Sequence, residues 1–286
     1  MRDDGRMPAD FRVMGIVNVT PDSFSDGGLF LETDAAVAHA LRLAEEGAAI
    51  LDVGGESTRP GARPVSADEE IERVLPVVER VAAAGTDAQI SIDTSKLAVA
   101  EAAADAGATY VNDVTAFRAA PEMAGLVAER DLECCLMHML GEPRTMQDDP
   151  RYDDVVSEVK AFLEERLAFA VAEGVPEESV MLDPGIGFGK TVEHNLELLR
   201  RLEEIAAIGR PVVIGTSRKS FLGRLTGRDV GERLSGTIAT SVIALEHGAS
   251  VFRVHEVAPV VDALAVTAAT VRPRWSATTR PTSTTS

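Results

Sequence analysis

The segment Asp183 to Lys190, DPGIGFGK, directly follows the short apolar run Val180 to Leu182. An apolar run that ends in an acid, a proline and alternating glycines predicts a buried strand leading into a loop whose backbone can approach a ligand closely. The Asp183 carboxylate can accept N–H donors from a flat heterocycle, and Phe188 offers a stacking face. A glycine-rich turn with a solvated acid is the alternative, because one glycine motif is weakly specific. Pro184 stands where a phosphate-binding Walker A loop needs glycine, which excludes that motif.

The order of apolar strand, polar loop and amphipathic helix recurs eight times along the chain. We predict strands at Val13 to Val17, Ile50 to Val53, Gln89 to Ile92, Thr109 to Val111, Cys134 to Met137, Val180 to Leu182, Val212 to Ile214 and Val251 to Val254. Short, uniformly apolar strands are typical of a parallel sheet buried on both faces. The pattern predicts an α/β fold, a single-domain (β/α)8 TIM barrel over residues 12–272. The alternative is an open doubly wound sheet, which normally has fewer strands and one glycine fingerprint.

Amphipathic helices are expected between these strands. Ser66 and Glu69 have the spacing of a capping box, and the apolar stripe that follows ends at Gly85. Further helices are predicted at Leu97 to Ala106, Pro121 to Arg130, Val192 to Ile208, Val230 to His247 and Ala258 to Val271. We expect residues 1–11 to be flexible and the Ser/Thr/Pro-rich residues 273–286 to be disordered.

The composition excludes several classes of partner. A formal net charge of −18 disfavours nucleic acid, because a duplex repels a protein that lacks a basic stripe. No apolar run is long enough to span a membrane, and the start of the chain lacks the apolar region of a secretory signal. We therefore expect a cytoplasmic protein without membrane partners. Cys134 and Cys135 are adjacent, so in a strand they point to opposite faces and are expected to be free thiols.

Polar side chains follow each predicted strand, at the end of a barrel where enzymes of this fold bind their substrates. One set suits the edge of a polar heterocycle and its apolar walls: Asp93, Asn112, Asp183, Met139 and Phe188. A second set suits a phosphate or carboxylate: Arg59, Ser217, Lys219, Arg253 and His255. Asn18 offers a neutral oxygen to a Mg²⁺ ion bound mainly by substrate phosphates and water.

Each of these residues has a structural alternative. Asp93 and Asp183 can be helix caps, Arg253 and His255 a surface pair, and Lys219 a solvated lysine. Their coincidence at one end of the barrel favours a single site.

The motifs resemble those of the dihydropteroate synthase family in order and in position, from about Met14 to Ala268. They are NVTPDSFSDGG, DVGGESTRPG, SIDTSK, VND, MHM, DPGIGFGK, SRKS and RVH. The resemblance implies an enzyme of folate biosynthesis that is inhibited by sulfonamides. In this family p-aminobenzoate displaces pyrophosphate from 6-hydroxymethyl-7,8-dihydropterin pyrophosphate to give 7,8-dihydropteroate. The resemblance also implies that Mg²⁺ is a cofactor and that the protein is a homodimer. Leu140 and Glu142 depart from the family pattern, which puts only the packing of that loop in doubt.

The resemblance also implies roles for individual residues. The catalytic residues would be Asp93, Asp183, Lys219, Arg253 and His255. The pterin would be bound by Asp93, Asn112, Met139, Asp183, Phe188, Gly215 and Lys219. Pyrophosphate would be bound by Asn18, Arg253 and His255, with Asn18 also touching the metal. The p-aminobenzoate would be bound by Thr58, Arg59, Pro60, Phe188, Ser217 and Lys219.

Two other functions are compatible with parts of this pattern. A corrinoid-type pterin-dependent methyltransferase shares the barrel and the pterin carboxylates, but it does not need the pyrophosphate cations. A non-catalytic pterin-binding paralogue is expected to lose Lys219, Arg253 or His255, and this chain retains all three.

Overall fold

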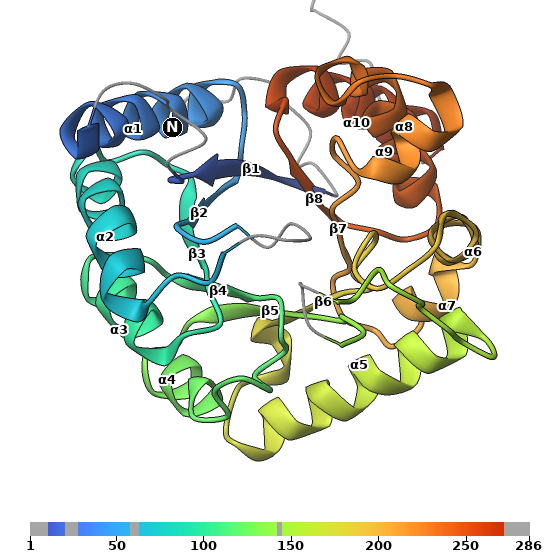
Figure 1. Cartoon of the computed structure of the whole chain (residues 1–286), viewed down its shortest axis with the longest axis horizontal. Coiled ribbons are helices and arrows are strands. Elements are labelled where there is room, and N and C mark those ends of the chain that lie inside the picture. The colour runs from blue at the N-terminus through green and yellow to red at the C-terminus, as the bar shows by residue number, and fades with distance from the viewer. Residues whose placement is uncertain (1–10, 21–27, 58–62, 142–144, 272–286) are drawn as a thin grey trace, which may run out of the picture.

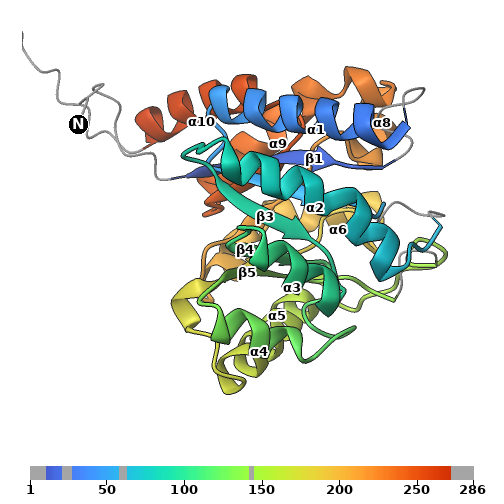
Figure 2. The same cartoon turned by 90° about the vertical axis from the view of Figure 1, so that its left-hand side faces the viewer.

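The computed structural model describes residues 11–20, 28–57, 63–141 and 145–271. In these ranges the strands form a central ring and the helices surround it (Figure 1), and the side view shows the helices packed along the outside of the sheet (Figure 2). The predicted single-domain (β/α)8 TIM barrel is confirmed. The predicted flexible start and disordered tail lie outside the described residues, apart from Phe11, whose ring packs edge-on against Phe252.

Parallel strands make up the ring in the order β6-β5-β4-β3-β2-β1-β8-β7. Their bounds are β1 Arg12–Asn18, β2 Ile50–Gly54, β3 Gln89–Asp93, β4 Tyr110–Asp113, β5 Glu133–Met137, β6 Val180–Asp183, β7 Val213–Ile214 and β8 Val251–Val254. A parallel bridge between Leu182 and Val212 joins the two ends of the sheet. All eight predicted strands are present within a residue or two of their expected bounds.

Helices connect the strands on the outer face. They are α1 Gly28–Glu45, α2 Ala67–Ala83, α3 Leu97–Asp105, α4 Met123–Glu129, α5 Val155–Ala172, α6 Val192–Arg200, α7 Leu202–Ala206, α8 Ser220–Thr226, α9 Leu234–Glu246 and α10 Val257–Val271, with short 3-10 turns η1 Glu177–Ser179 and η2 Val230–Glu232. The predicted capping box at Ser66 and Glu69 is confirmed at the start of α2. No helix in the described ranges is long and apolar enough to cross a membrane.

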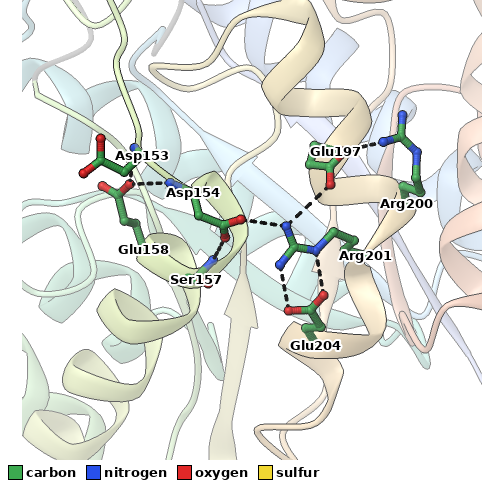
Figure 3. Close-up of polar contacts among 8 residues, drawn as sticks. All are labelled: Asp153, Asp154, Ser157, Glu158, Glu197, Arg200, Arg201 and Glu204. Carbon is green, nitrogen blue, oxygen red and sulfur yellow. Dashed lines mark hydrogen bonds and ion pairs between the residues drawn. The ribbon is translucent and has the colours of Figure 1, made fainter.

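The predicted helix Val192 to Ile208 is divided at Arg201, whose backbone leaves the helical region. The Arg201 guanidinium lies between Asp154 at 2.8 Å, Glu204 at 2.6 Å and Glu197 at 3.5 Å (Figure 3). Asp154 also caps α5 by accepting the N–H of Ser157 at 2.7 Å. The network therefore ties the start of α5 to the junction of α6 and α7. Tertiary contact at Arg201 overrides the continuous helical pattern of the sequence.

The core has an outer layer between the sheet and the helices and an inner layer that fills the barrel. The inner layer comprises Met14, Ile50, Tyr110, Cys135, Met181, Val213 and Val251. Cys134 belongs to the outer layer, so the adjacent cysteines do lie on opposite faces of β5, and both are buried and free. Burial raises the pKa of both thiols, which keeps them protonated and unreactive.

Candidate active site

An arginine–carboxylate network lies at the carboxyl ends of the strands. Arg253 of β8 donates from Nε to Asp52 at 2.6 Å and from Nη2 to Asp93 at 2.7 Å. Asp52 of β2, with no exposed side-chain surface, also accepts from Ser91 at 2.6 Å and from Asn112 at 3.1 Å. Four strands therefore contribute to one hydrogen-bonded cluster. The alternative that made Asp93 a helix cap is wrong, because the cap of the following helix α3 is Lys96. The alternative that made Arg253 part of a surface pair is also wrong, because Arg253 pairs with the largely buried Asp93 and Asp52.

The charges in this network affect one another strongly. Burial raises the pKa of Asp93 to about 7, and the negative charges of Asp52, Glu70 and Asp113 add to this increase, while Arg253 opposes it. Burial acts to lower the pKa of Arg253, but the carboxylates of Asp52 and Asp93 hold it above its usual value. Arg253 is therefore a permanent cation, whereas Asp93 can exchange a proton near neutral pH.

The DPGIGFGK loop follows β6, as predicted. Asp183 is buried and accepts the N–H of Gly185 at 2.6 Å. Burial raises the pKa of Asp183, while that N–H and the charges of Lys219, Lys190 and Arg253 lower it. The cap of the following helix is Thr191, so Asp183 is not a helix cap. The charges of both the Arg253 network and Lys219 therefore act on Asp183.

The glycines of this loop make room for other parts of the protein. Gly185 has a φ of +68°, and a Cβ at this position would lie 1.9 Å from the backbone oxygen of His138. A Cβ at Gly189 would lie 2.6 Å from the Cβ of Leu140. A Cβ at Gly187 would lie 3.1 Å from the Lys219 side chain. The expected close approach therefore occurs, but its partners are the β5 and β7 loops. Leu140, which departs from the family pattern, packs directly on the Gly189 backbone.

Phe188 forms one wall of this end of the barrel. The Lys219 Nζ atom lies 3.9 Å from the centre of the Phe188 ring, a cation–π contact. Phe188 also packs on an apolar cluster of Met139, Met137, Met146 and Val114. The predicted pterin residues Met139, Phe188 and Lys219 are thus brought together, and Lys219 is not a solvated lysine.

A buried lysine lies behind this wall. Lys190 Nζ is 2.9 Å from His138 Nδ1 and donates to the Phe188 carbonyl at 3.0 Å. Burial lowers the pKa of Lys190 to about 7 and that of His138 to about 2. Sequence reasoning assigned no role to this pair, and the lysine in a glycine-rich loop was the available signal.

The loops after β7 and β8 contribute the remaining predicted side chains. Ser217 Oγ lies 2.9 Å from His255 Nδ1 and accepts the His255 backbone N–H at 3.2 Å. Gly215 faces Arg253, since a Cβ on the glycine would be 3.9 Å from the arginine Cβ. Ser217, predicted for the aminobenzoate side, is therefore in contact with the predicted pyrophosphate ligand His255.

Predicted ligand residues also stand at the ends of β1 and β2 or in the loops that follow them. Asn18 ends β1, is half-buried, and stands in register with Gly54 of β2. Thr58, Arg59 and Pro60, predicted for p-aminobenzoate, lie outside the described residues, as does Glu142.

Asp52 and Asn112, which are hydrogen-bonded to each other, complete the buried polar part of the site. Asp52 was not given a role from the sequence, although an acid within an otherwise apolar buried strand was a usable signal.

The arrangement as a whole is a barrel whose strand ends carry buried carboxylates, an apolar wall and fixed cations. A profile of the family described as pterin binding enzyme matches residues 14–255. The chain belongs to this family of pterin-binding barrel enzymes.

Within this family the chain is similar to dihydropteroate synthases. The enzyme of Escherichia coli K12 is 48% identical over 259 residues, which cover 91% of each chain. The enzyme of Haemophilus influenzae is 45% identical and covers 91% of this chain and 94% of its own. The solved structure of Xanthomonas albilineans dihydropteroate synthase with 4-aminobenzoic acid has a TM-score of 0.85 and 50% identity, covering 91% of this chain and 92% of the other. The chain therefore belongs to the dihydropteroate synthase family, whose members are transferases.

Proposed function

We propose that this site joins 6-hydroxymethyl-7,8-dihydropterin pyrophosphate to p-aminobenzoate, forming 7,8-dihydropteroate and releasing pyrophosphate in folate biosynthesis. The observation that carries the proposal is the division of charge around Arg253. The buried carboxylates Asp52, Asp93 and Asp183 come from β2, β3 and β6, whereas the cations and donors come from β8 and from the loops after β7 and β8, and Arg253 pairs directly with Asp52 and Asp93. This division suits a reaction in which a cationic pterin and an anionic leaving group separate.

The roles follow from that division. Asp93, Asn112 and Asp183 bind the pterin edge and stabilise its developing positive charge, with Phe188 and Met139 as walls. The bond between the methylene carbon and the pyrophosphate oxygen breaks while Arg253 and His255 bind the leaving group. The amine nitrogen of p-aminobenzoate then forms a bond to that carbon and releases one proton to solvent. Lys219 is assigned to both the pterin and the incoming amine, and its contact with Phe188, a proposed pterin wall, supports this assignment.

Mg²⁺ is part of the proposal. In the described part of the chain no group of three or more His, Cys, Asp or Glu side chains is placed to hold a metal. A single neutral oxygen from Asn18 fits an ion that is held mainly by substrate phosphates and water. The ion, when bound, neutralises negative charge on the pyrophosphate.

The decisive assay measures both products. Purified protein with Mg²⁺ and the two substrates should release dihydropteroate and pyrophosphate in equal amounts. Asp93→Asn and Arg253→Ala should each lower kcat by about a hundredfold or more, because lost electrostatic contacts to a transition state commonly cost about 3 kcal/mol. Asp262→Asn, on the exposed face of α10, is the control. Pyrophosphate release without dihydropteroate would reject the transfer reaction.

We also propose a homodimer located in the cytoplasm. Exposed apolar side chains on α8, η2, α9 and α10 support the dimer: Leu225, Val230, Ile243 and Val266. Two free buried thiols are compatible with a reducing compartment. Sedimentation equilibrium tests the dimer directly. The alternatives, a corrinoid-type methyltransferase and a non-catalytic paralogue, gain no support from the relatives described above.

A further inference from the structure

Arg218 adopts an unusual backbone conformation inside the site. It has a φ of +58° and is the third residue of a turn that closes with the Lys219 N–H donating to the Thr216 carbonyl at 3.1 Å. Glycine or asparagine is favoured at such a position, because a Cβ makes the left-handed region unfavourable. An arginine held in this strained conformation suggests that its side chain supplies something that glycine cannot.

The Arg218 side chain contacts the loop after β8. Its Nε donates to Glu256 Oε1 at 2.8 Å, and its Nη2 contacts the same oxygen. The other carboxylate oxygen of Glu256 is buried and has no hydrogen-bond partner among the described residues. Arg218 is therefore the group that balances the Glu256 charge in the described structure.

The Arg218 backbone is also held from α9. Its N–H donates to Thr237 Oγ1 at 3.3 Å, and its carbonyl accepts from Arg233 Nη1 at 3.0 Å. These bonds fix the peptide units on both sides of the strained residue. Because Lys219 follows directly, the same bonds set where the Lys219 side chain begins.

The pair lies beside a second contact between the same two loops. Ser217 meets His255, and the next residue in each loop forms the Arg218–Glu256 pair. The strands below pair through Val213 with Val251 and Ile214 with Phe252. Two neighbouring side-chain contacts thus extend the pairing of β7 and β8 into the loops that carry Lys219 and His255, next to Arg253 of β8.

We propose that Arg218 and Glu256 form a positioning pair that fixes Lys219 relative to Arg253 and His255. This assignment rests on the proposed function, in which Lys219 lies at the pterin and the other two at the leaving group. Neither Arg218 nor Glu256 touches substrate in this scheme. The pair acts by keeping the two halves of the site at the spacing that the transition state requires.

Steady-state kinetics separates this role from a merely structural one. Arg218→Ala and Glu256→Gln should each lower kcat about tenfold, with a smaller change in either KM, because a positioning defect affects the transition state most. Arg218→Gly should retain more activity than Arg218→Ala, since glycine accepts the positive φ. Arg218→Lys should restore part of the loss. The double variant Arg218→Ala/Glu256→Gln should be no slower than the worse single variant.

The matched control is the exposed pair of Arg228, which precedes η2, and Glu232, which ends it, 3.7 Å apart. Arg228→Ala should leave kcat and both KM values unchanged. If Arg218→Ala and Glu256→Gln also stay within twofold of an active wild type, the positioning role is rejected. Absence of product from the wild type would instead reject the proposed function.

Hydrogen exchange tests the pair without relying on activity. In the substrate-free protein, Arg218→Gly should speed amide exchange at least fivefold in both 216–221 and 253–257, whereas Arg228→Ala should not. Acceleration in both segments supports the coupling of the loops even if the variants prove inactive. Wild-type exchange rates in both segments for Arg218→Gly would overturn the proposal.

Discussion

Asp52 is a residue on which several side chains of the described part of the site converge. Its carboxylate holds Arg253, Asn112 and Ser91, and its side chain is fully buried. Asp52→Asn should lower the free energy of unfolding by about 3 kcal/mol, because removal of one partner leaves a buried charge incompletely paired. Urea denaturation measures this. The control Asp262→Asn, on an exposed helix face, should change stability by less than about 0.5 kcal/mol. Equal effects of the two variants would show that Asp52 is dispensable for the network.

Asp93 gives the protein a predictable dependence on pH. Burial raises the pKa of Asp93 from 3.8 to about 7, so the folded state binds more protons than the unfolded state between these values. The stability that Asp93 contributes is therefore greatest below about pH 4 and is lost as the pH rises to about 7. The stability of the wild type relative to Asp93→Asn should fall from pH 5 to pH 7 and level off above that. A relative stability that rises with pH would mean that the ion pair with Arg253 outweighs the effect of burial.

The sequence predicted residues at strand ends better than the residues that support them. Asp93, Asp183 and Arg253 follow apolar runs directly, so the barrel rule places them at the site. The role of Asp52 depends on Arg253, which lies 201 residues away in the chain. The Lys190–His138 contact spans 52 residues. Such pairings depend on side-chain directions inside the closed barrel, which local patterns do not specify.

The loop after β6 is an element whose shape depends on glycine. Gly185→Ala should destabilise the protein by about 3 kcal/mol or more, because a Cβ would combine a left-handed backbone with a collision against the His138 carbonyl. Gly227 ends α8 at a similar φ of +72°, and no atom lies within 4 Å of its Cβ position. Gly227→Ala should therefore cost only about 1 kcal/mol. Thermal unfolding of both variants checks the contrast, and similar losses would show that the loop adjusts to the extra atom.

Element boundaries were predictable where signals are local. The capping box at Ser66 and the glycines after the helices specify where helices begin and end. The division of the helix at Arg201 was not predictable, because its partner Asp154 lies 47 residues away. The α8 helix was also missed, since its seven residues are too few to show a periodic pattern.

At the scale of the whole molecule, the charge of −18 should make stability depend on salt. Repulsion among excess carboxylates opposes the compact state, and raising NaCl from about 10 mM to about 1 M shortens the Debye length from about 30 Å to about 3 Å. The free energy of unfolding at pH 8 should therefore rise with NaCl. Near the isoelectric point of about 4.7 this rise should disappear. Salt curves that match at the two pH values would indicate an ion-exclusion effect independent of protein charge.

The strand pairs that close the barrel differ in how many hydrogen-bonded positions they share, which determines where the chain can be circularly permuted. Among the described residues, β6 and β7 meet through one bridge, Leu182 to Val212, whereas β1 and β2 share a continuous register from Met14 to Asn18. In a circular permutant with its new ends between α7 and β7, β6 and β7 would no longer be linked by the chain, and the single bridge would have to keep the barrel closed. With new ends between β1 and β2, the continuous pairing of these two strands would still hold the barrel closed. The connection between β1 and β2 is therefore the better position for new termini.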